Sequence, residues 1–316
     1  MNTRHSLPRC LLLCLLLAWT AGSLAPGSAA GAASREANGF STWVWNPWLL
    51  RSSPDELLRF AAANGVKTLY VQIDPELAAA DYAAFIRRAS AQRIEVHALD
   101  GAPAWATDRR LPEAFLSWLT GYQNSADMDE RFSGIHIDVE PYLLPEWTTG
   151  REALLQSWKT HMNVVLAGAR RLRLSAEADI PFWFHEQALP GETSTLSAWI
   201  IDRFDGVTIM AYRDSAEAIV EAARAELAEG EQLGKPVRIA VETNRSAETP
   251  KVTFYEEGPE TLNAQLESAR RTLKQSPAFA GFDVHDYEGW KTLLSKPSAS
   301  QLAAKPAAKK PVAKKK

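Results

Sequence analysis

The chain has 316 residues, of which 46% are hydrophobic and 23% charged, and its formal net charge at pH 7 is -3. A chain of this length usually forms one large domain or two small ones. Both cysteines, Cys10 and Cys14, lie in an apolar segment near the N-terminus. If that segment is removed, the composition excludes disulfide bonds and cysteine-ligated metals.

The N-terminus has the features of a secretory signal peptide. Two arginines precede an apolar run over residues 10–19, and small residues follow it. We expect residues 1–33 to be this signal, with cleavage near Ala30 or Ala33, and the protein to be exported to the periplasm or out of the cell. An uncleaved membrane anchor is the alternative, but the apolar run is too short to span a bilayer.

The C-terminal end has a composition of its own. Residues 296–316 consist mainly of Lys, Ala and Pro, cannot bury a core, and are expected to be disordered. This tail holds seven lysines and the signal two arginines, both without acids, so the formal charge of -3 becomes -12 for residues 34–295. The tail is either a solvated end or an electrostatic tether to an anionic surface. An exported protein with an acidic body is not expected to bind nucleic acid.

Residues 34–295 alternate between strand-like and helix-like segments. Helix starts carry a proline and acids, as at Pro54, Pro112 and Pro259. Eight repeats in this length predict a single α/β domain, a (β/α)8 TIM barrel, whereas no Gly-x-Gly-x-x-Gly follows the first strand to support a doubly wound sheet. The expected strands are 39–46, 67–74, 94–101, 134–142, 174–183, 206–214, 236–244 and 280–287.

Within these strands, apolar residues alternate with polar ones. The apolar face is expected to pack on the helices and the polar face to line the barrel. Polar groups are costly to bury unless they are paired or functional, and barrel enzymes place their sites at the C-terminal ends of the strands. We therefore expect a substrate-binding set there, comprising Gln72, Asp74, Glu177, Asp179, Asp214, Glu242, Asn244, His285 and Tyr287.

The fourth expected strand carries the most specific signal. Its apolar residues alternate with His136, Asp138 and Glu140, so a strand would place all three ionisable side chains on one face. Asp138 and Glu140 would lie about 7 Å apart along the backbone. Such a pair can break a glycosidic bond, because one carboxyl protonates the leaving oxygen while the other stabilises positive charge at the sugar.

The segment 133–140 resembles the fourth-strand motif of family 18 glycoside hydrolases, the chitinase-like barrels, whose pattern is Asp-Gly-x-Asp-x-Asp-x-Glu. Asp138 and Glu140 match the last two acids, and the segment 209–214 resembles the family's Met-x-Tyr-Asp with one residue inserted. The resemblance implies that Glu140 is the general acid and base. It also implies that Asp138 orients the substrate N-acetyl group, which attacks the anomeric carbon, and that Tyr212 helps to hold this group.

Two motif acids are replaced, by Ser133 and His136. The residue that supports Asp138 in the family is thereby changed, and Asp138 could instead pair internally with His136. Family 25 lysozyme-like barrels also carry an Asp-x-Glu on a central strand. Both resemblances imply an N-acetylated glycan as substrate.

Aromatic and histidine side chains complete the candidate set. Tryptophans could stack on sugar rings or fill the core, namely Trp43, Trp45, Trp48, Trp183 and Trp290. Histidines and a carboxylate could bind metal, namely His97, His136, His285 and Asp283, but none has a tight ligand spacing such as His-Glu-x-x-His. We therefore expect neither a metal nor an organic cofactor, and His136 is assigned to substrate binding with Trp43 and Trp45.

Three functions remain open from the sequence. The first is a glycoside hydrolase that cleaves an N-acetylhexosamine-containing polysaccharide with Glu140 and Asp138. The second is a retaining glycosidase in which Glu140 is acid and base and Glu242 is the nucleophile. The third is a carbohydrate-binding barrel without catalysis, which the replaced motif acids suggest.

Overall fold

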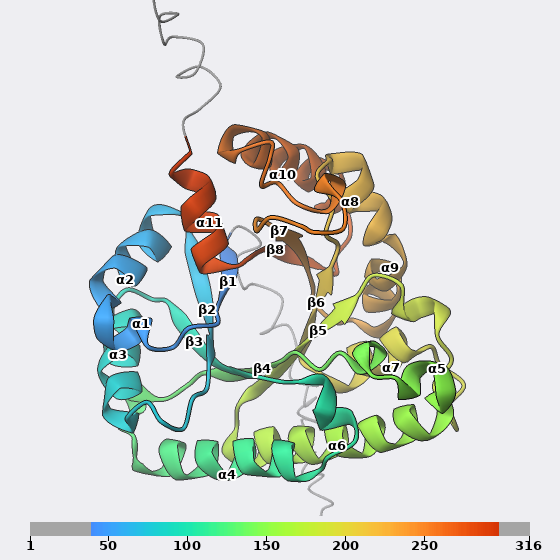
Figure 1. Cartoon of the computed structure of the whole chain (residues 1–316), viewed down its shortest axis with the longest axis horizontal. Coiled ribbons are helices and arrows are strands. Elements are labelled where there is room, and N and C mark those ends of the chain that lie inside the picture. Colours follow the sequence, from blue (N-terminus) through green and yellow to red (C-terminus); the bar gives the residue numbers. More distant parts are fainter. Residues whose placement is uncertain (1–38, 297–316) are drawn as a thin grey trace, which may run out of the picture. The chain divides into compact units, whose positions relative to one another are not determined.

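The structure, a computed structural model, describes residues 39–296. Parallel strands close into a barrel in the order β1 to β8, with the helices outside it (Figure 1). This confirms the predicted (β/α)8 fold. The expected signal and residues 297–316 of the expected tail lie outside the described residues. The strands are β1 (Phe40–Val44), β2 (Val66–Gln72), β3 (Glu95–Asp100), β4 (Gly134–Ile137), β5 (Ser175–Pro181), β6 (Gly206–Met210), β7 (Val237–Glu242) and β8 (Phe279–His285).

The helices follow the strands along the chain, and the prolines mark several of their starts. Pro54 and Pro259 open α2 and α10 as predicted, because a first-turn residue needs no N–H inside the helix. The α-helices are α1 (Leu49–Ser52), α2 (Pro54–Ala63), α3 (Ala79–Ala91), α4 (Arg110–Ser125), α5 (Glu146–Thr149), α6 (Arg151–Leu172), α7 (Leu196–Arg203), α8 (Ala216–Ala222), α9 (Arg224–Leu233), α10 (Pro259–Leu273) and α11 (Tyr287–Leu294). Short 3-10 helices are η1 (Pro103–Ala106), η2 (Met128–Glu130), η3 (Pro141–Leu143), η4 (Phe184–Glu186) and η5 (Pro250–Val252).

The main hydrophobic core lies between the strands and the helices. Alternate residues of β2, Leu69 and Val71, are fully buried in it, as are Ile209 of β6 and Ile239 of β7. Burying one such side chain contributes about 1.5–3 kcal/mol. The apolar face of each strand therefore packs on the helices as predicted, and the other face lines the barrel.

Strand β4 ends earlier than predicted, at Ile137 instead of residue 142. The N–H of Asp138 still donates to the carbonyl of Asp100 at 3.1 Å, and the chain then turns into η3 at Pro141. The pairing stops because the chain must leave the sheet toward its next helix. Asp138 and Glu140 consequently follow the strand instead of lying on it.

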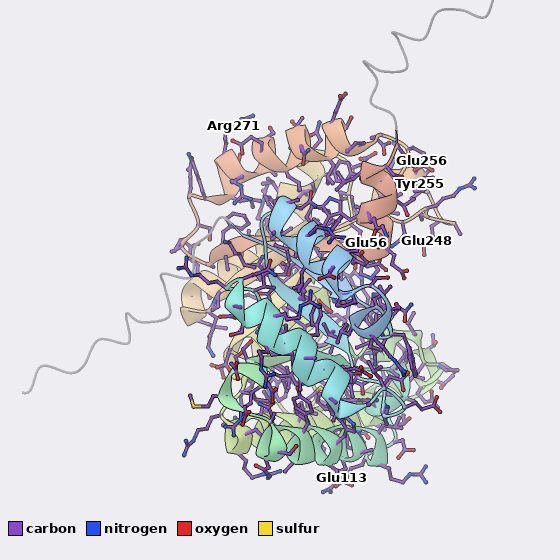
Figure 2. The ribbon with its side chains drawn as sticks, turned by 90° about the vertical axis from the view of Figure 1, so that its left-hand side faces the viewer. Glu56, Glu113, Glu248, Tyr255, Glu256 and Arg271 are labelled. Carbon is purple, nitrogen blue, oxygen red and sulfur yellow. The ribbon has the colours of Figure 1, made fainter. Side chains whose placement is uncertain are left out.

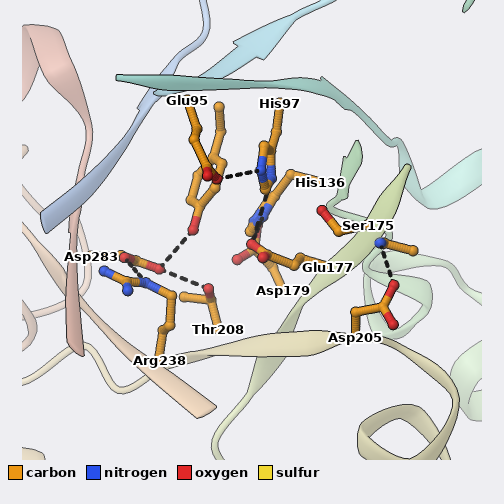
Figure 3. Close-up of polar contacts among 12 residues, drawn as sticks. Glu95, His97, His136, Ser175, Glu177, Asp179, Asp205, Thr208, Arg238 and Asp283 are labelled. Carbon is orange, nitrogen blue, oxygen red and sulfur yellow. Dashed lines mark hydrogen bonds and ion pairs between the residues drawn. The ribbon is translucent and has the colours of Figure 1, made fainter. Parts of the chain in front are cut away.

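The inside of the barrel contains a small apolar cluster and a charged one. Trp43, Tyr70, Leu99 and Ala240 form the apolar cluster. Beside it, the guanidinium of Arg238 pairs with Asp283 at 2.6 Å (Figure 3). Charged groups that are placed in an interior require such partners, because their hydration is lost.

Asp283 is the most heavily bonded of these interior groups. One carboxylate oxygen takes the pair with Arg238, and the other accepts hydrogen bonds from Tyr70 at 3.2 Å and Thr208 at 2.7 Å. Arg238 also donates to the carbonyl oxygens of Gly39, Ala280 and Phe282. The pair therefore joins β8 to β2, β6 and β7 and to Gly39, just before β1.

Charged side chains of the helices face outward, including Glu113 on α4 and Arg271 on α10 (Figure 2). No helix within residues 39–296 is both long enough and apolar enough to span a membrane.

We predict that Asp283→Asn lowers the free energy of unfolding by about 3–5 kcal/mol, because it leaves the largely buried charge of Arg238, 19% exposed, without its anion. Glu267→Gln is the matched control, since Glu267 pairs with Arg271 at 3.6 Å on the surface and its loss costs at most about 1 kcal/mol. Urea unfolding of both variants measures the difference. Equal losses would contradict a stabilising interior pair.

Candidate active site

Asp138 is positioned by a close backbone approach between two strand ends. Gly101, just after β3, has a φ of +151°, and a Cβ there would lie 2.2 Å from the carbonyl oxygen of Asp138. Only glycine fits at this place. The strand order and Gly101 together bring Asp138 to the C-terminal end of the barrel.

Asp138 is half-buried, and its Oδ1 has no hydrogen-bond partner. Burial raises the pKa of Asp138 well above its usual value, and the charges of Asp179 and Glu140 add to this effect. They outweigh the opposing charges of His136 and His285. Asp138 therefore tends to be neutral, and its Oδ1 is shielded from solvent without a hydrogen-bond partner in the protein.

Glu140 lies two residues further along and is half-buried. Tyr142 donates a hydrogen bond from its hydroxyl to Oε1 of Glu140. Burial raises the pKa of Glu140, and the charge of Asp179 adds to the effect, although the bond from Tyr142 opposes it. A carboxyl with a raised pKa can hold the proton that a general acid delivers.

Directly below these acids, His136 pairs with Asp179 of β5. Nε2 of His136 lies 2.9 Å from Oδ2 of Asp179 (Figure 3). The same oxygen accepts a hydrogen bond from Nε1 of Trp43 at 3.0 Å. The ring of Tyr70 stacks on His136 with 3.6 Å between ring centroids. Burial disfavours the charged imidazole, but the charge of Asp179 outweighs burial and raises the pKa of His136 to about 10.

One layer further in, Glu177 lies between two histidines. Its Oε2 is 3.6 Å from Nδ1 of His97 and 3.8 Å from Nδ1 of His136. Burial raises the pKa of Glu177, but the two imidazoles outweigh it and lower this pKa to about 2. Glu177 is therefore an internal anion.

Glu242, at the end of β7, is held by four hydrogen bonds. Its Oε1 accepts from the backbone of Thr243 at 2.7 Å and from the backbone and side-chain nitrogens of Asn244 at 2.6 and 3.0 Å. Its Oε2 lies 2.8 Å from Nδ1 of His285. Burial is outweighed by these bonds, which lower the pKa of Glu242, so this carboxylate stays ionised.

Tyr212, which follows β6, lies among these acids. Its ring packs against the interior cluster, with 5.9 Å between the centroids of Tyr212 and His285. Burial raises the pKa of Tyr212 well above its usual value, and the charges of Glu242, Asp179, Asp138 and Glu140 raise it further. Its hydroxyl therefore keeps its proton and can donate a hydrogen bond.

An aromatic wall, defined as Tyr142, Trp147, Trp183 and Phe184, adjoins Glu140. The rings of Tyr142 and Trp183 contact edge to face at 5.2 Å between centroids, and those of Trp147 and Trp183 at 5.8 Å. Trp147 and Trp183 are partly exposed. Of the four residues of this wall, only Trp183 is predicted from the sequence as a possible stacking residue. No periodic pattern marks Trp147, because it lies in α5, a helix of only four residues.

Several residues of the expected substrate-binding set lie in the interior instead. Trp43 is 1% exposed and His136 is fully buried, so neither can contact a substrate at the mouth in this structure. Tyr287 was expected to face inward, but it opens α11 and packs edge to face on Phe60 of α2. Trp290 packs on Phe60 as well. We therefore revise these assignments, and that of Glu177, from substrate contact to packing and pairing.

Other residues of the set support neighbouring groups. Asp74 accepts a hydrogen bond from Nε1 of the exposed Trp48 at 3.0 Å, and Gln72 donates to Asp100 at 3.3 Å. Asn244 holds Glu242. Asp214 lies in the loop after β6, where its N–H donates to the carbonyl of Lys251. The acids and aromatic rings that the structure does bring together are Asp138, Glu140, Asp179, Tyr212, Glu242, His285 and Trp45.

A separate hollow of about 770 Å³ opens where α6 begins, next to Pro190 and Gly191. Its lining contains none of the carboxylates described above. Among residues 39–296, no group of three or more His, Cys, Asp or Glu side chains is arranged to hold a metal ion.

Solved structures share this fold, and two of them illustrate the similarity to this chain. One is a mutant of a family 18 chitinase from Cycas revoluta in complex with (GlcNAc)4, with a TM-score of 0.50 and 11% identity over 80% of this chain and 96% of that chain. The other is the C-terminal domain of a presumed chitinase from Desulfitobacterium hafniense, with a TM-score of 0.53 and 8% identity over 80% of this chain and 94% of that chain. No family model and no curated protein matches the sequence. The resemblance to family 18 barrels is thereby confirmed at the level of the fold.

We predict that His136 keeps its proton up to a pH of about 10, against 6.5 in the unfolded chain. Because the folded pKa is the higher one, the contribution of His136 to stability is complete below pH 6.5 and is lost as the pH rises toward about 10. Nitrogen-detected NMR titration measures the pKa directly. Unfolding of wild type and His136→Gln across this range should show a difference that shrinks with rising pH. A midpoint near 6.5 would contradict the pairing with Asp179.

Proposed function

We propose that the protein is an exported glycoside hydrolase that cleaves an N-acetylhexosamine-containing polysaccharide. The observation that carries this proposal is the pairing of Glu140 and Asp138 at the C-terminal end of the barrel, each with a raised pKa. The shared fold with chitinase barrels supports the choice of substrate class.

In the proposed reaction, Glu140 gives its proton to the glycosidic oxygen as the bond between this oxygen and the anomeric carbon breaks. The carbonyl oxygen of the substrate's own acetamide group forms a bond to the anomeric carbon from the other side. A water molecule then displaces the acetamide oxygen, and Glu140 takes a proton from that water. The proton balance closes, because Glu140 ends in the state in which it began.

Asp138 and Tyr212 orient the acetamide group in this reaction. Asp138, which directly follows β4 at the C-terminal end of the barrel, is the acceptor for the acetamide N–H. Tyr212 keeps its proton and can donate to the acetamide oxygen before attack. The aromatic wall next to Glu140 offers apolar surface for neighbouring sugar rings.

One observation favours the second mechanism, in which Glu242 attacks the sugar. The pKa of Glu140 is raised and that of Glu242 is lowered, and opposite shifts of two carboxyls are typical of an acid and a nucleophile. Against it, both oxygens of Glu242 are already engaged by hydrogen bonds. We therefore assign Glu242 to holding His285.

We predict that Glu140→Gln lowers turnover of an N-acetylated polysaccharide by about 10²–10⁴-fold, because amides do not transfer this proton. Asp138→Asn should lose activity as well, and a deacetylated polysaccharide should not be cleaved by wild type. Release of reducing ends measures all three. Equal cleavage of the deacetylated polymer would rule out attack by the acetamide, and glycan binding without turnover would indicate a binding barrel.

Glu242→Gln separates the two mechanisms. If Glu242 only holds His285, this variant should keep measurable turnover, with the main change in substrate affinity. If Glu242 is the nucleophile, turnover should disappear while binding persists. Glu248→Gln is the matched control, because Glu248 is exposed on the loop after β7.

Export is a separate part of the proposal and rests on residues 1–33 of the sequence. The N-terminal sequence of the protein recovered from its native host should begin near residue 31 or 34. Recovery of the intact N-terminus from the cytoplasm would contradict it.

A further inference from the structure

Trp45 and His285 make a contact at the mouth of the barrel that the proposed reaction does not use. Trp45 follows β1 and is half-buried, and its Nε1–H donates to Nε2 of His285 at 3.0 Å. The two rings meet at 62° with 6.1 Å between centroids, so the indole is turned toward the imidazole through its N–H. The indole thus occupies the outer nitrogen of His285.

The partner on the other side of His285 fixes its tautomer. Nδ1 of His285 lies 2.8 Å from Oε2 of Glu242, and the hydrogen bonds to Glu242 keep that carboxylate ionised. Because a carboxylate can only accept, Nδ1 must carry the proton. Nε2 then has a free lone pair, which is what the indole N–H requires.

The contact between Trp45 and His285 depends on the protonation state of His285, which the surrounding charges influence. Burial lowers the pKa of His285, but Glu242 on β7, Asp286 and Asp138 outweigh burial and raise it. Glu140 also interacts with His285 through its charge, and the ring of Tyr212 lies 5.9 Å away. A proton on Nε2 would place two N–H groups against each other, so the contact with Trp45 belongs to the neutral form of His285.

We propose that Trp45 is a removable cap on His285, and that a hydroxyl or acetamide N–H of the glycan replaces the indole N–H on Nε2 when substrate binds. Both are neutral donors, so the exchange requires no proton transfer. His285 becomes a substrate-binding residue, held in place by Glu242, and Trp45 opposes binding until it moves. The identity of the ligand rests on the proposed function, whereas the cap itself does not.

The cap makes Trp45→Phe a variant that binds sugar more tightly. This change removes the competing N–H but keeps an aromatic ring. In a Glu140→Gln background, at a pH above the titration of His285, the Kd for an N-acetylglucosamine tetrasaccharide should fall about 2- to 12-fold, the equivalent of one hydrogen bond of about 0.5–1.5 kcal/mol. Isothermal titration calorimetry measures it, and His285→Phe should weaken binding.

Trp199→Phe is the matched control, because Trp199 is buried on α7, outside the barrel, and its Nε1 has no hydrogen-bond partner. It should leave the Kd unchanged. Weaker binding by Trp45→Phe would overturn the cap, since the indole would then be a platform for the sugar. An unchanged Kd would overturn it as well.

Nitrogen-detected NMR of the ligand-free protein tests the cap without any sugar. His285 should show an unprotonated Nε2 above its pKa, and the indole signal of Trp45 should shift as His285 titrates. Absence of that coupling would overturn the cap. If the coupling is present but neither wild type nor Trp45→Phe binds the tetrasaccharide, the glycan is wrong as the ligand. Binding without turnover by wild type would overturn only the proposed hydrolase.

Discussion

A charge that is buried inside a barrel must find an opposite charge there, and this constraint shapes the interior of the protein. Arg238 and Asp283 satisfy it in one part of the interior and His136 and Asp179 in another, with each pair formed between different strands. An unpaired charge in either place would lose its hydration without compensation. Because strand order and register determine which side chains are neighbours, they also determine which interior side chains can be charged.

The mouth of the barrel has the opposite property, because its acids are only partly paired. Asp138 keeps an oxygen without a partner, and Glu140 has the hydroxyl of Tyr142 as its hydrogen-bond donor. Glu242, by contrast, is saturated with donors. The pKa of Glu140 is therefore raised and that of Glu242 is lowered. Acid–base catalysis uses two carboxyl groups whose pKa values differ in this way. The electrostatics favour Glu140 as the proton donor over Glu242.

The sequence predicts the barrel well, because a repeated alternation of apolar segments is a property of the chain itself. It also places Asp138 and Glu140 at the end of the fourth strand. The sequence pattern does not indicate how deep inside the barrel a side chain lies. Trp43 on β1 and Trp45 just after it fall on the same face in the alternation of the sequence, yet Trp43 is 1% exposed inside the barrel and Trp45 is half-buried at the mouth. Tyr287 continues the alternation of β8 on paper, but α11 has begun there.

His136 illustrates why a departure from a motif needs its neighbours to be interpreted. Taken alone, a histidine in place of the family's acid suggests that Asp138 has lost its support. In the structure the imidazolium faces Asp179 of the adjacent strand, so the layer below Asp138 still contains a carboxylate. An acid at position 136 would instead crowd Asp179 with a like charge in a dry interior. His136 in place of the acid and Asp179 on the adjacent strand therefore depend on each other. Burial and the charge of Asp179 still raise the pKa of Asp138. The substitution alters how the site is supported without removing the acid pair on which the proposed chemistry depends.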